Sequence, residues 1–350
     1  MEHPTRVGKY EVEQFLGGGM SHVYRAKDTV LGRRVALKIL TEAGAADAEA
    51  KARFLMEARM ASNISHENII SVYDFGEDRG RPFIVMEFLE GESLRDAIKN
   101  NHLGDTQSRI RAALQVARAL DYIHSRKIIH RDIKPENIHI DAVAKVTLMD
   151  FGIAKSEGVA LTRAGFTLGT PYYMAPEQVL GRPLTPQADV YAFGILMFEM
   201  MTSAKPVSGD SVEKIFQQIL YEPLNMEPLK TSRVPAPLAD LISRCTAKQL
   251  VQRPPNLGIV CAELERMLDP GRSPARPPQP AARPQTAPVN IPAAGAYIET
   301  PEPMPAGLPS FLQHMPGPFR TQGGLMLLAC LAVVAGLGFV YLLLWLAGAV

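Results

Sequence analysis

The sequence predicts an α+β globular unit over about residues 10–268, followed by an extended linker and one transmembrane helix. Strand-like and helix-like runs alternate with short turns throughout the first of these segments. Proline then recurs every few residues across 269–322, and 323–350 contains no charged residue. The composition, with 47% hydrophobic and 21% charged residues, is typical of a chain that builds a folded core.

The first expected element is a hairpin around three consecutive glycines, within FLGGGMSHVY at residues 15–24. The flanking runs read as strands whose apolar wall includes Val12, Phe15, Val23 and Tyr24. Glycine in a turn allows positive φ and close approach of the backbone to a ligand. Taken alone, the pattern fits a plain hairpin turn as well as it fits a loop that covers phosphate.

The next expected strand, RRVALKIL, carries a single cation, Lys38, in its apolar part. A lysine buried there needs an anionic partner, and the helical stretch AKARFLMEARMASNI supplies Glu57. A solvated lysine on an edge strand is the alternative interpretation.

Polar residues then crowd into IIHRDIKPENIHI, between apolar runs at 128–129 and 138–140 that we expect to be strands. Such crowding on a rigid scaffold is typical of a catalytic loop. Asp132 could accept a proton, Lys134 could neutralise phosphate, and Asn137 could offer an amide oxygen to a metal ion.

A second oxygen ligand follows in VTLMDFGIAK, where Asp150 comes at the end of an apolar strand. Magnesium prefers a few hard protein oxygens together with phosphate and water. Asp150 and Asn137 therefore predict a magnesium site.

These motifs closely resemble those of Hanks-type serine/threonine protein kinases, of the bacterial, membrane-tethered kind related to the PASTA-kinase group. They appear in the family's order: the glycine loop, VALK, the helix glutamate, HRDIKPEN, DFG, and APE within GTPYYMAPEQ. The resemblance covers about residues 10–268. It implies a bilobal protein-kinase fold with a β-rich lobe at about 10–89, a helical lobe at about 90–268 and ATP between them, here without an extracellular sensor domain.

The resemblance implies an ATP:protein phosphotransferase that uses Mg²⁺, for which Mn²⁺ can substitute. Lys38 would hold the α- and β-phosphates and pair with Glu57, and Asp132 would orient and deprotonate the substrate hydroxyl. Lys134 would sit on the γ-phosphate. The implied metal ligands are Asn137 and Asp150.

The ATP-binding surface implied by the resemblance combines the glycine loop with the segment that joins the lobes. Met86 falls at the gatekeeper position, and the backbone of Glu87 and Leu89 is expected to hydrogen-bond adenine. The residues implied to contact ATP are Leu16, Gly17, Gly18, Gly19, Met20, Ser21, Val23, Ala36, Lys38, Met86, Glu87, Leu89, Ser93 and His139.

Two positions depart from the family's pattern. Relatives often read LGxGGMGxVY, whereas LGGGMSHVY is one residue shorter. Counted back from Val23 or forward from Gly17, the family's three glycine positions do not all fall on glycines. We therefore expect a phosphate-covering loop with a tightened tip, and which amides reach phosphate stays open. The other departure is His139, which we expect to replace an apolar residue beneath adenine.

Regulation by phosphorylation is expected from the charges around the catalytic loop. Arg131 precedes Asp132, and phosphate on the following activation segment could pair with it and order that segment. Thr162 lies where relatives autophosphorylate, and Thr167 is a second candidate. Thr170 is expected to hydrogen-bond Asp132 and Lys134. The structural anchors implied by the resemblance are Asp189 and the pair Glu177 with Arg253.

The same motifs support other functions less well. A nucleotide-binding pseudokinase scaffold at the membrane is supported only by the short glycine loop, because Lys38, Asp132 and Asp150 are all present. Small-molecule phosphotransfer is disfavoured by APEQ and the threonine-bearing activation segment, and tyrosine specificity by Lys134. With 37 basic and 36 acidic residues, the chain lacks the bulk positive charge of nucleic-acid binders. The expected partners are therefore Ser/Thr protein substrates and a second copy of the chain in trans, as a homodimer.

The C-terminal segments predict a membrane anchor. The proline-rich segment 269–322 cannot bury enough apolar surface to order itself, so we expect a disordered juxtamembrane linker. At about 1.5 Å per residue, the helix expected over 323–350 exceeds the roughly 30 Å of bilayer hydrocarbon. Arginines precede this run, which places the catalytic unit on the cytoplasmic face. We expect a single-pass, tail-anchored protein of the cell membrane, in contact with lipid through 323–350.

Overall fold

The computed structural model of the chain describes residues 3–150, 171–269 and 271. The chain divides into a unit at 1–278 and a second at 279–350, which lies wholly outside the described residues. Residues 272–322 of the linker expected over 269–322, the expected transmembrane helix, Thr162, Thr167 and Thr170 also lie outside them. Within the described ranges, no helix combines the length and hydrophobicity needed to cross a bilayer.

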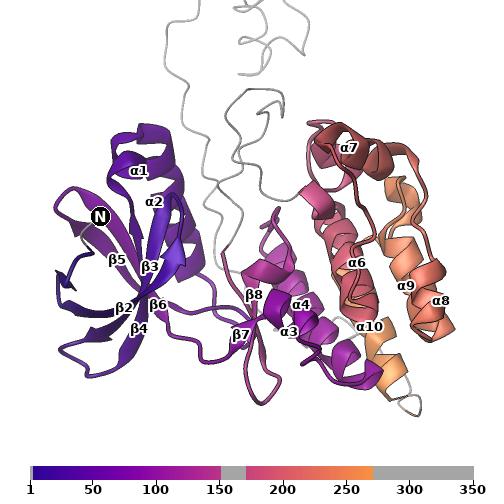
Figure 1. Ribbon diagram of the computed structural model, residues 1–350, viewed down its shortest axis with the longest axis horizontal. Helices are drawn as coiled ribbons and strands as arrows, with labels where there is room; N and C mark the ends of the chain where they lie inside the picture. The colour runs from indigo at the N-terminus through magenta and orange to yellow at the C-terminus, as the bar shows by residue number, and fades with distance from the viewer. Residues whose placement is uncertain (1–2, 151–170, 270, 272–350) are drawn as a thin grey trace, which may run out of the picture. The chain divides into compact units, whose positions relative to one another are not determined.

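The N-terminal lobe is an antiparallel sheet with the strand order β1-β2-β3-β4-β6-β5 (Figure 1). Its alternating pattern turns apolar side chains such as Tyr24 and Leu37 into a shared core. The strands are β1 (Arg6–Val7), β2 (Tyr10–Gly18), β3 (Ser21–Asp28), β4 (Arg34–Leu40), β5 (Val72–Asp78) and β6 (Arg81–Glu87). The sheet thus begins before the expected start of the domain at about residue 10.

Two helices follow β4 in this lobe, α1 (Glu42–Ala46) and α2 (Ala48–Ser62). Thr41 and Asp47 cap their N-termini by accepting hydrogen bonds from backbone amides of the first turn. Phe54 and Ala58 of α2 pack on Leu40 and Ile84 of the sheet. This packing turns the helix so that Glu57 can reach β4.

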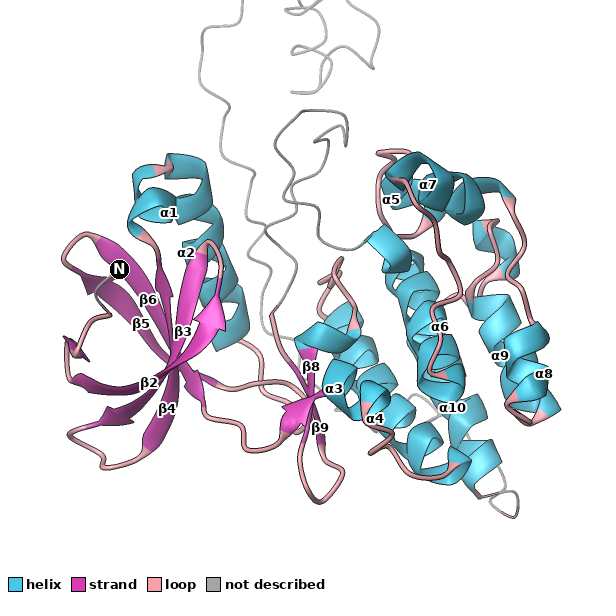
Figure 2. Cartoon of the chain, viewed as in Figure 1, coloured by secondary structure: helices cyan, strands magenta, loops and turns pink. Residues whose placement is uncertain are grey.

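The C-terminal lobe is helical, with a small sheet of β7 (Glu92–Ser93), β8 (Ile138–Ile140) and β9 (Val146–Leu148) beside its helices (Figure 2). Short 3₁₀ turns connect several elements, namely η1 (Pro135–Asn137), η3 (Pro171–Tyr173) and η4 (Leu250–Gln252). The helices are α3 (Leu94–Lys99), α4 (Thr106–Ser125), α5 (Pro176–Val179), α6 (Pro186–Thr202), α7 (Val212–Tyr221), α8 (Glu227–Thr231), α9 (Ala236–Cys245) and α10 (Leu257–Leu268).

Helix α6 is the centre of this lobe. Its sequence is apolar on every side, and it is buried almost throughout, as expected for a helix surrounded by protein. A Cβ atom at Gly194 would lie 2.7 Å from the Cβ of Cys245, so glycine lets α9 approach α6 closely. This buried helix carries Asp189, the anchor expected from the sequence.

The apolar run 128–129 is not a strand, contrary to the sequence prediction. The backbone amide of Ile128 donates to the carbonyl of Ile123 and so closes the end of α4. The amide of His130 is bound by Asp189. The amides of Ile128 and His130 therefore bond to the end of a helix and to a side chain, and not to a neighbouring strand.

Candidate active site

The backbone of the catalytic loop is held by side chains from the helical core. The buried carboxylate of Asp189 accepts hydrogen bonds from the amides of His130 (2.7 Å) and Arg131 (2.9 Å). The Gln178 amide donates to the carbonyl oxygen of Arg131 at 3.0 Å. Arg131 has a φ of 68°, a left-handed conformation that costs free energy in a non-glycine residue. The bonds from both sides hold the loop in this conformation.

Asp132, Lys134 and Asn137 form one hydrogen-bonded cluster. The Lys134 ammonium lies 2.8 Å from Asp132 Oδ2, and the Asn137 side-chain amide donates to the same oxygen at 3.0 Å. That amide also donates to the backbone carbonyl of Asp132 at 2.8 Å. Turn η1, which begins at Pro135, brings these side chains together. The residues expected as base, cation and metal ligand therefore lie at one place.

Lys38 of β4 lies between two carboxylates that come from different parts of the chain. Its ammonium is 2.9 Å from Glu57 Oε1 of α2 and 2.8 Å from Oδ1 of Asp150, which follows β9. Only 12% of the Lys38 side chain and 15% of the Glu57 side chain are exposed. Burial alone would lower the pKa of Lys38, but the carboxylates of Asp150 and Glu57 outweigh it and raise that pKa. The lysine is therefore a permanent cation that joins the two lobes.

The neighbourhood of Asp150 fits a magnesium ion. Lys38 holds the pKa of Asp150 below its usual range, so this side chain is a carboxylate. The amide of Met149 donates to the carbonyl of Asn137 at 2.8 Å, which ties Asp150 to the Asn137 turn. Because the Asn137 nitrogen donates to Asp132, its side-chain oxygen is the atom suited to a metal. A carboxylate and an amide oxygen are hard ligands of the kind magnesium takes together with phosphate and water.

Within the described part of the chain, no group of three or more His, Cys, Asp or Glu could hold a metal ion. His130 is fully buried beside the loop, and burial lowers the pKa of its imidazole. A neutral ring there supports the backbone without adding charge to the site.

The glycine hairpin has the tightened tip that the short sequence predicts. Strand β2 runs to Gly18 and β3 starts at Ser21, so the turn is very short. Gly17 and Gly18 have φ values of 141° and 137°. A Cβ atom at Gly18 would lie 2.0 Å from the carbonyl oxygen of Ser21, which excludes any other residue. Gly19 has open space around it and no such constraint.

The other residues expected around ATP lie along the sheet and the segment that joins the lobes. Met86 of β6 pairs with Ala36 of β4. The amide of Glu87 donates to the carbonyl of Ser71 at 2.9 Å. Ser93 caps α3 by accepting from the amide of Asp96. Residues 16, 20, 21 and 23 lie in the glycine hairpin, and residue 89 lies in the segment that joins the lobes.

His139 lies in a groove of about 390 Å³ between the joining segment and the β8–β9 hairpin. Its Nδ1 is 2.9 Å from the carbonyl oxygen of Glu92, and burial lowers the pKa of the ring. Glu87 and Leu89 line the same groove. The ring is thus fixed by its backbone partner rather than merely filling the space of a leucine.

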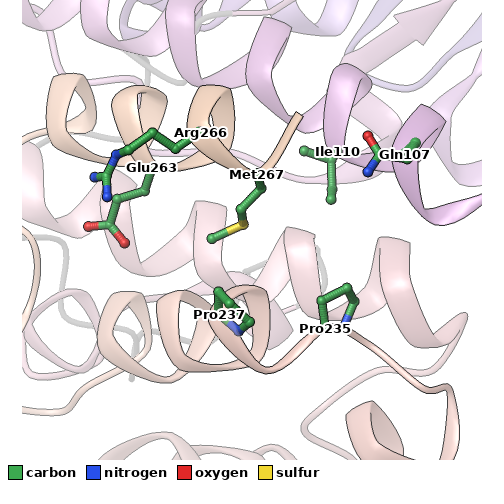
Figure 3. A pocket seen from close by; sticks show the side chains of 7 residues that line it. All are labelled: Gln107, Ile110, Pro235, Pro237, Glu263, Arg266 and Met267. Atoms are coloured by element: carbon green, nitrogen blue, oxygen red, sulfur yellow. The ribbon is translucent and has the colours of Figure 1, made fainter. Parts of the chain in front are cut away.

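A second depression, of about 420 Å³, lies within the helical lobe (Figure 3). It is formed by the start of α4, the start of α9 and the end of α10, and it includes none of the residues expected at the active site. Its lining residues are Gln107, Ile110, Pro235, Pro237, Glu263, Arg266 and Met267.

The expected ion pair between Glu177 and Arg253 is present and buried. The guanidinium donates to both carboxylate oxygens, at 2.7 and 2.9 Å, and 0% of the Arg253 side chain is exposed. Arg253 also donates to the carbonyls of Ala247 and Gln187. This pair fixes α5, which follows the activation segment, to the turn after α9.

Sequence reasoning missed several supports of the site. Gln178 was visible as the last letter of APEQ, but nothing marked it as a partner of Arg131. His124, whose Nε2 lies 2.7 Å from Asp189, reads in the sequence as an ordinary residue near a helix end. Thr41, whose hydroxyl donates to the carbonyl of Met20 in the glycine hairpin, belongs to no motif.

This arrangement of lobes, catalytic loop and bridging lysine defines a protein kinase, and comparison with known proteins agrees. The protein kinase domain family matches residues 10–263, and the chain belongs to this family. Its relatives are bacterial serine/threonine kinases, which confirms the resemblance to the Hanks type.

The particular relatives are 34% and 37% identical to the chain over the matched residues. Serine/threonine-protein kinase PrkC of Bacillus subtilis is 37% identical over 70% of this chain, and the match spans only 38% of PrkC. Serine/threonine-protein kinase PknA of Mycobacterium tuberculosis is 34% identical, over 82% of this chain and 68% of PknA. Among solved structures, Rad53 residues 1–466 in complex with AMP-PNP match with a TM-score of 0.62 at 25% identity, over 73% of this chain and 64% of that chain.

Proposed function

We propose that the chain is a serine/threonine protein kinase that transfers the γ-phosphate of ATP to hydroxyl groups of proteins, itself included. The observation that carries this proposal is the Lys38 ammonium held between Glu57 and Asp150, beside a loop that presents Asp132. The bacterial relatives PrkC and PknA are named as serine/threonine-protein kinases, which supports the same activity here.

The proposed mechanism assigns one task to each group of the site. Asp132 orients the substrate hydroxyl and accepts its proton as the phosphoryl group transfers. Lys134, 2.8 Å from that carboxylate, neutralises charge on the transferred group. Lys38 holds the α- and β-phosphates, and Glu57 keeps the lysine in place. Asn137 and Asp150 would hold Mg²⁺, which would neutralise negative charge on the phosphates of ATP.

The adenine is proposed to bind beside the segment that joins the lobes. Because the Glu87 amide already donates to Ser71, the contacts to adenine fall to the carbonyl of Glu87 and the backbone of Leu89. Ala36 and Val23 from the sheet, with Met86 behind them, would complete the apolar surroundings. His139 would lie on the opposite side of the adenine ring.

A pseudokinase scaffold is the weaker alternative. Its sole support is the short glycine loop, and the loop still forms a hairpin between intact strands. Lys38, Asp132 and Asp150 are all present, and this supports phosphotransfer over a scaffold role.

The test of the function is incubation of the full chain with Mg²⁺ and ATP, followed by mass spectrometry of phosphorylated residues. We expect phosphate on Thr162, because an anion there can pair with Arg131 and order the activation segment. Thr162→Ala should therefore lower activity toward a protein substrate more than Thr167→Ala does.

The two threonine variants serve as controls for each other, since each removes one hydroxyl from the same segment. Full activity of Thr162→Ala, with phosphate found only elsewhere, would show that another residue is the regulatory one. Absence of any phosphotransfer by the unmodified chain would refute the kinase assignment itself.

We also infer that residues 323–350 anchor the protein in a membrane, with the kinase domain on the cytoplasmic face. The run has no charged residue, and Arg272, Arg276, Arg283 and Arg320 all precede it. Small residues at Ala332 and Gly336 could pack two such helices together and favour phosphorylation in trans.

Membrane fractionation and protease protection check this anchoring. We expect the full chain in the membrane fraction and a chain ending at residue 271 in the soluble fraction. In sealed vesicles, protease should remove the kinase domain only when the cytoplasmic face is outside. Recovery of the intact full chain as a soluble protein, or digestion from the external face, would contradict the proposed topology.

A further inference from the structure

The tip of the glycine hairpin is bonded to the junction of β4 and α1. The backbone amide of Thr41 donates to the carbonyl oxygen of Met20 at 3.1 Å, and the Thr41 hydroxyl donates to the same oxygen at 2.9 Å. Met20 lies in the turn itself, between the end of β2 and the start of β3. Two donors on one carbonyl make this a clamp on the hairpin tip.

The Thr41 hydroxyl has a second task that fixes its orientation. It accepts a hydrogen bond from the amide of Gly44 at 3.1 Å and thereby caps α1. A hydroxyl has one proton to donate and lone pairs to accept with, so both bonds form together. A Cβ atom at Gly44 would lie 3.2 Å from the Met20 oxygen, so the first turn of α1 is close against the tip.

The clamp lies near the proposed phosphate site along the same strands. Ser21 pairs with Leu40 and Val23 pairs with Lys38, so the clamp between Met20 and Thr41 lies three positions beyond the lysine. At about 3.3 Å per residue, that is roughly 10 Å along the strand. Beyond Thr41 the chain continues through α1 into α2, which carries Glu57. Thr41 thus connects the hairpin tip with the element that positions Lys38.

We propose that Thr41 is a positioning residue that holds the shortened glycine loop in place for ATP. This inference rests on the proposed role of the hairpin in covering phosphate. A loop with one residue fewer can adjust its conformation less when ATP binds. The bonds from Thr41 fix the position of the hairpin tip before ATP binds. Preorganisation of this kind lowers the cost of binding the ligand.

The sheet contains a matched control for this clamp. The amide and hydroxyl of Thr29 both donate to the carbonyl of Lys9, at 3.1 and 2.8 Å. This is the same pair of bonds at the opposite end of the β2–β3 hairpin, where Tyr10 pairs with Asp28. Thr29→Val therefore removes an equivalent bond without touching the tip.

The experiment measures KM for ATP and kcat of the full chain with myelin basic protein, and Tm by circular dichroism. Thr41→Val should raise KM for ATP about threefold to tenfold, the effect of one hydrogen bond, with kcat changed less. Thr41→Asp, whose side chain can still cap α1 but cannot donate to Met20, should raise KM likewise. Thr41→Ser and Thr29→Val should keep the KM of the unmodified chain.

The outcomes distinguish failure of the positioning role of Thr41 from failure of the proposed kinase activity. Unchanged KM in Thr41→Val and Thr41→Asp would overturn the positioning role while leaving the kinase assignment intact. An equal rise in Thr29→Val would show a general effect of sheet stability, which also overturns it. Failure of the unmodified chain to transfer phosphate would instead remove the proposed function, and the inference with it.

Discussion

Asp132→Asn should lower kcat for phosphotransfer by about 10² to 10⁴, the usual contribution of a general base. Asparagine has the size of aspartate, and its oxygen can still accept from Lys134 and Asn137, which lie 2.8 and 3.0 Å from the carboxylate. It cannot take up the proton of the substrate hydroxyl. The affinity for ATP should change little, because Asp132 is proposed to act on the substrate side.

The measurement pairs steady-state kinetics with titration of a fluorescent ATP analogue. Asp240→Asn is a suitable control, since this exposed aspartate pairs with Arg244 on the surface of α9. We expect it to retain full activity. Equal kcat in Asp132→Asn and the unmodified chain would exclude Asp132 as the base.

Arg253→Met should lower the free energy of unfolding by about 3 to 5 kcal/mol, because it leaves a buried carboxylate without its partner. The Glu177 side chain is only 7% exposed, and each of its carboxylate oxygens accepts a hydrogen bond from this guanidinium. The substitution also removes donors to the carbonyls of Ala247 and Gln187. Methionine keeps much of the volume, so the effect measures lost charge pairing more than a cavity.

Arg118→Met provides the comparison, because Arg118 pairs with Glu265 at 2.7 Å while both side chains are more than 40% exposed. Exposed pairs contribute about 0 to 1 kcal/mol. Urea unfolding should be followed by far-UV circular dichroism, since the single tryptophan, Trp345, lies outside the kinase domain. A loss in Arg253→Met no larger than in Arg118→Met would mean that the buried pair contributes no more than a surface pair.

The catalytic loop could be predicted closely because its groups are near neighbours in the chain. Asp132, Lys134 and Asn137 occupy one short segment, and a proline at the start of η1 favours the turn that gathers them. Their side-chain chemistry is a property of the residues themselves. The Lys38 prediction was of the same kind, since a cation in an apolar strand demands an anion wherever the strand lies.

The glycine loop shows where counting along a sequence fails. The two counts, from Gly17 and from Val23, disagree because the sequence has one residue fewer between these positions than the family's pattern. Which residues of the hairpin face each other is set instead by the pairing of β2 with β3, and this pairing shifts between Phe15 and Gly17. A bulge adds a residue to one strand only, so the register between the two strands shifts there. Its place depends on how β2 fits its neighbour, which is a property of the pair of strands.

The run 128–129 was predicted wrongly for a related reason. Isoleucines favour strands, but this preference is weak against tertiary contacts. The end of α4 and the carboxylate of Asp189 supply partners for the amides of Ile128 and His130. Neither partner lies in the segment on which the prediction was made.

The sequence by itself determined the family, the lobes and the chemical identity of the expected site residues. Only the tertiary structure decided which groups meet: Asp150 with Lys38, 112 positions earlier, Gln178 with the carbonyl of Arg131, and Thr41 with the hairpin tip. The reason is that charge and hydrogen-bonding capacity belong to a residue, whereas a partner distant in the chain is set by how whole strands and helices pack. A hydroxyl such as that of Thr41 can bond almost any carbonyl, and only the fold brings Met20 within its reach.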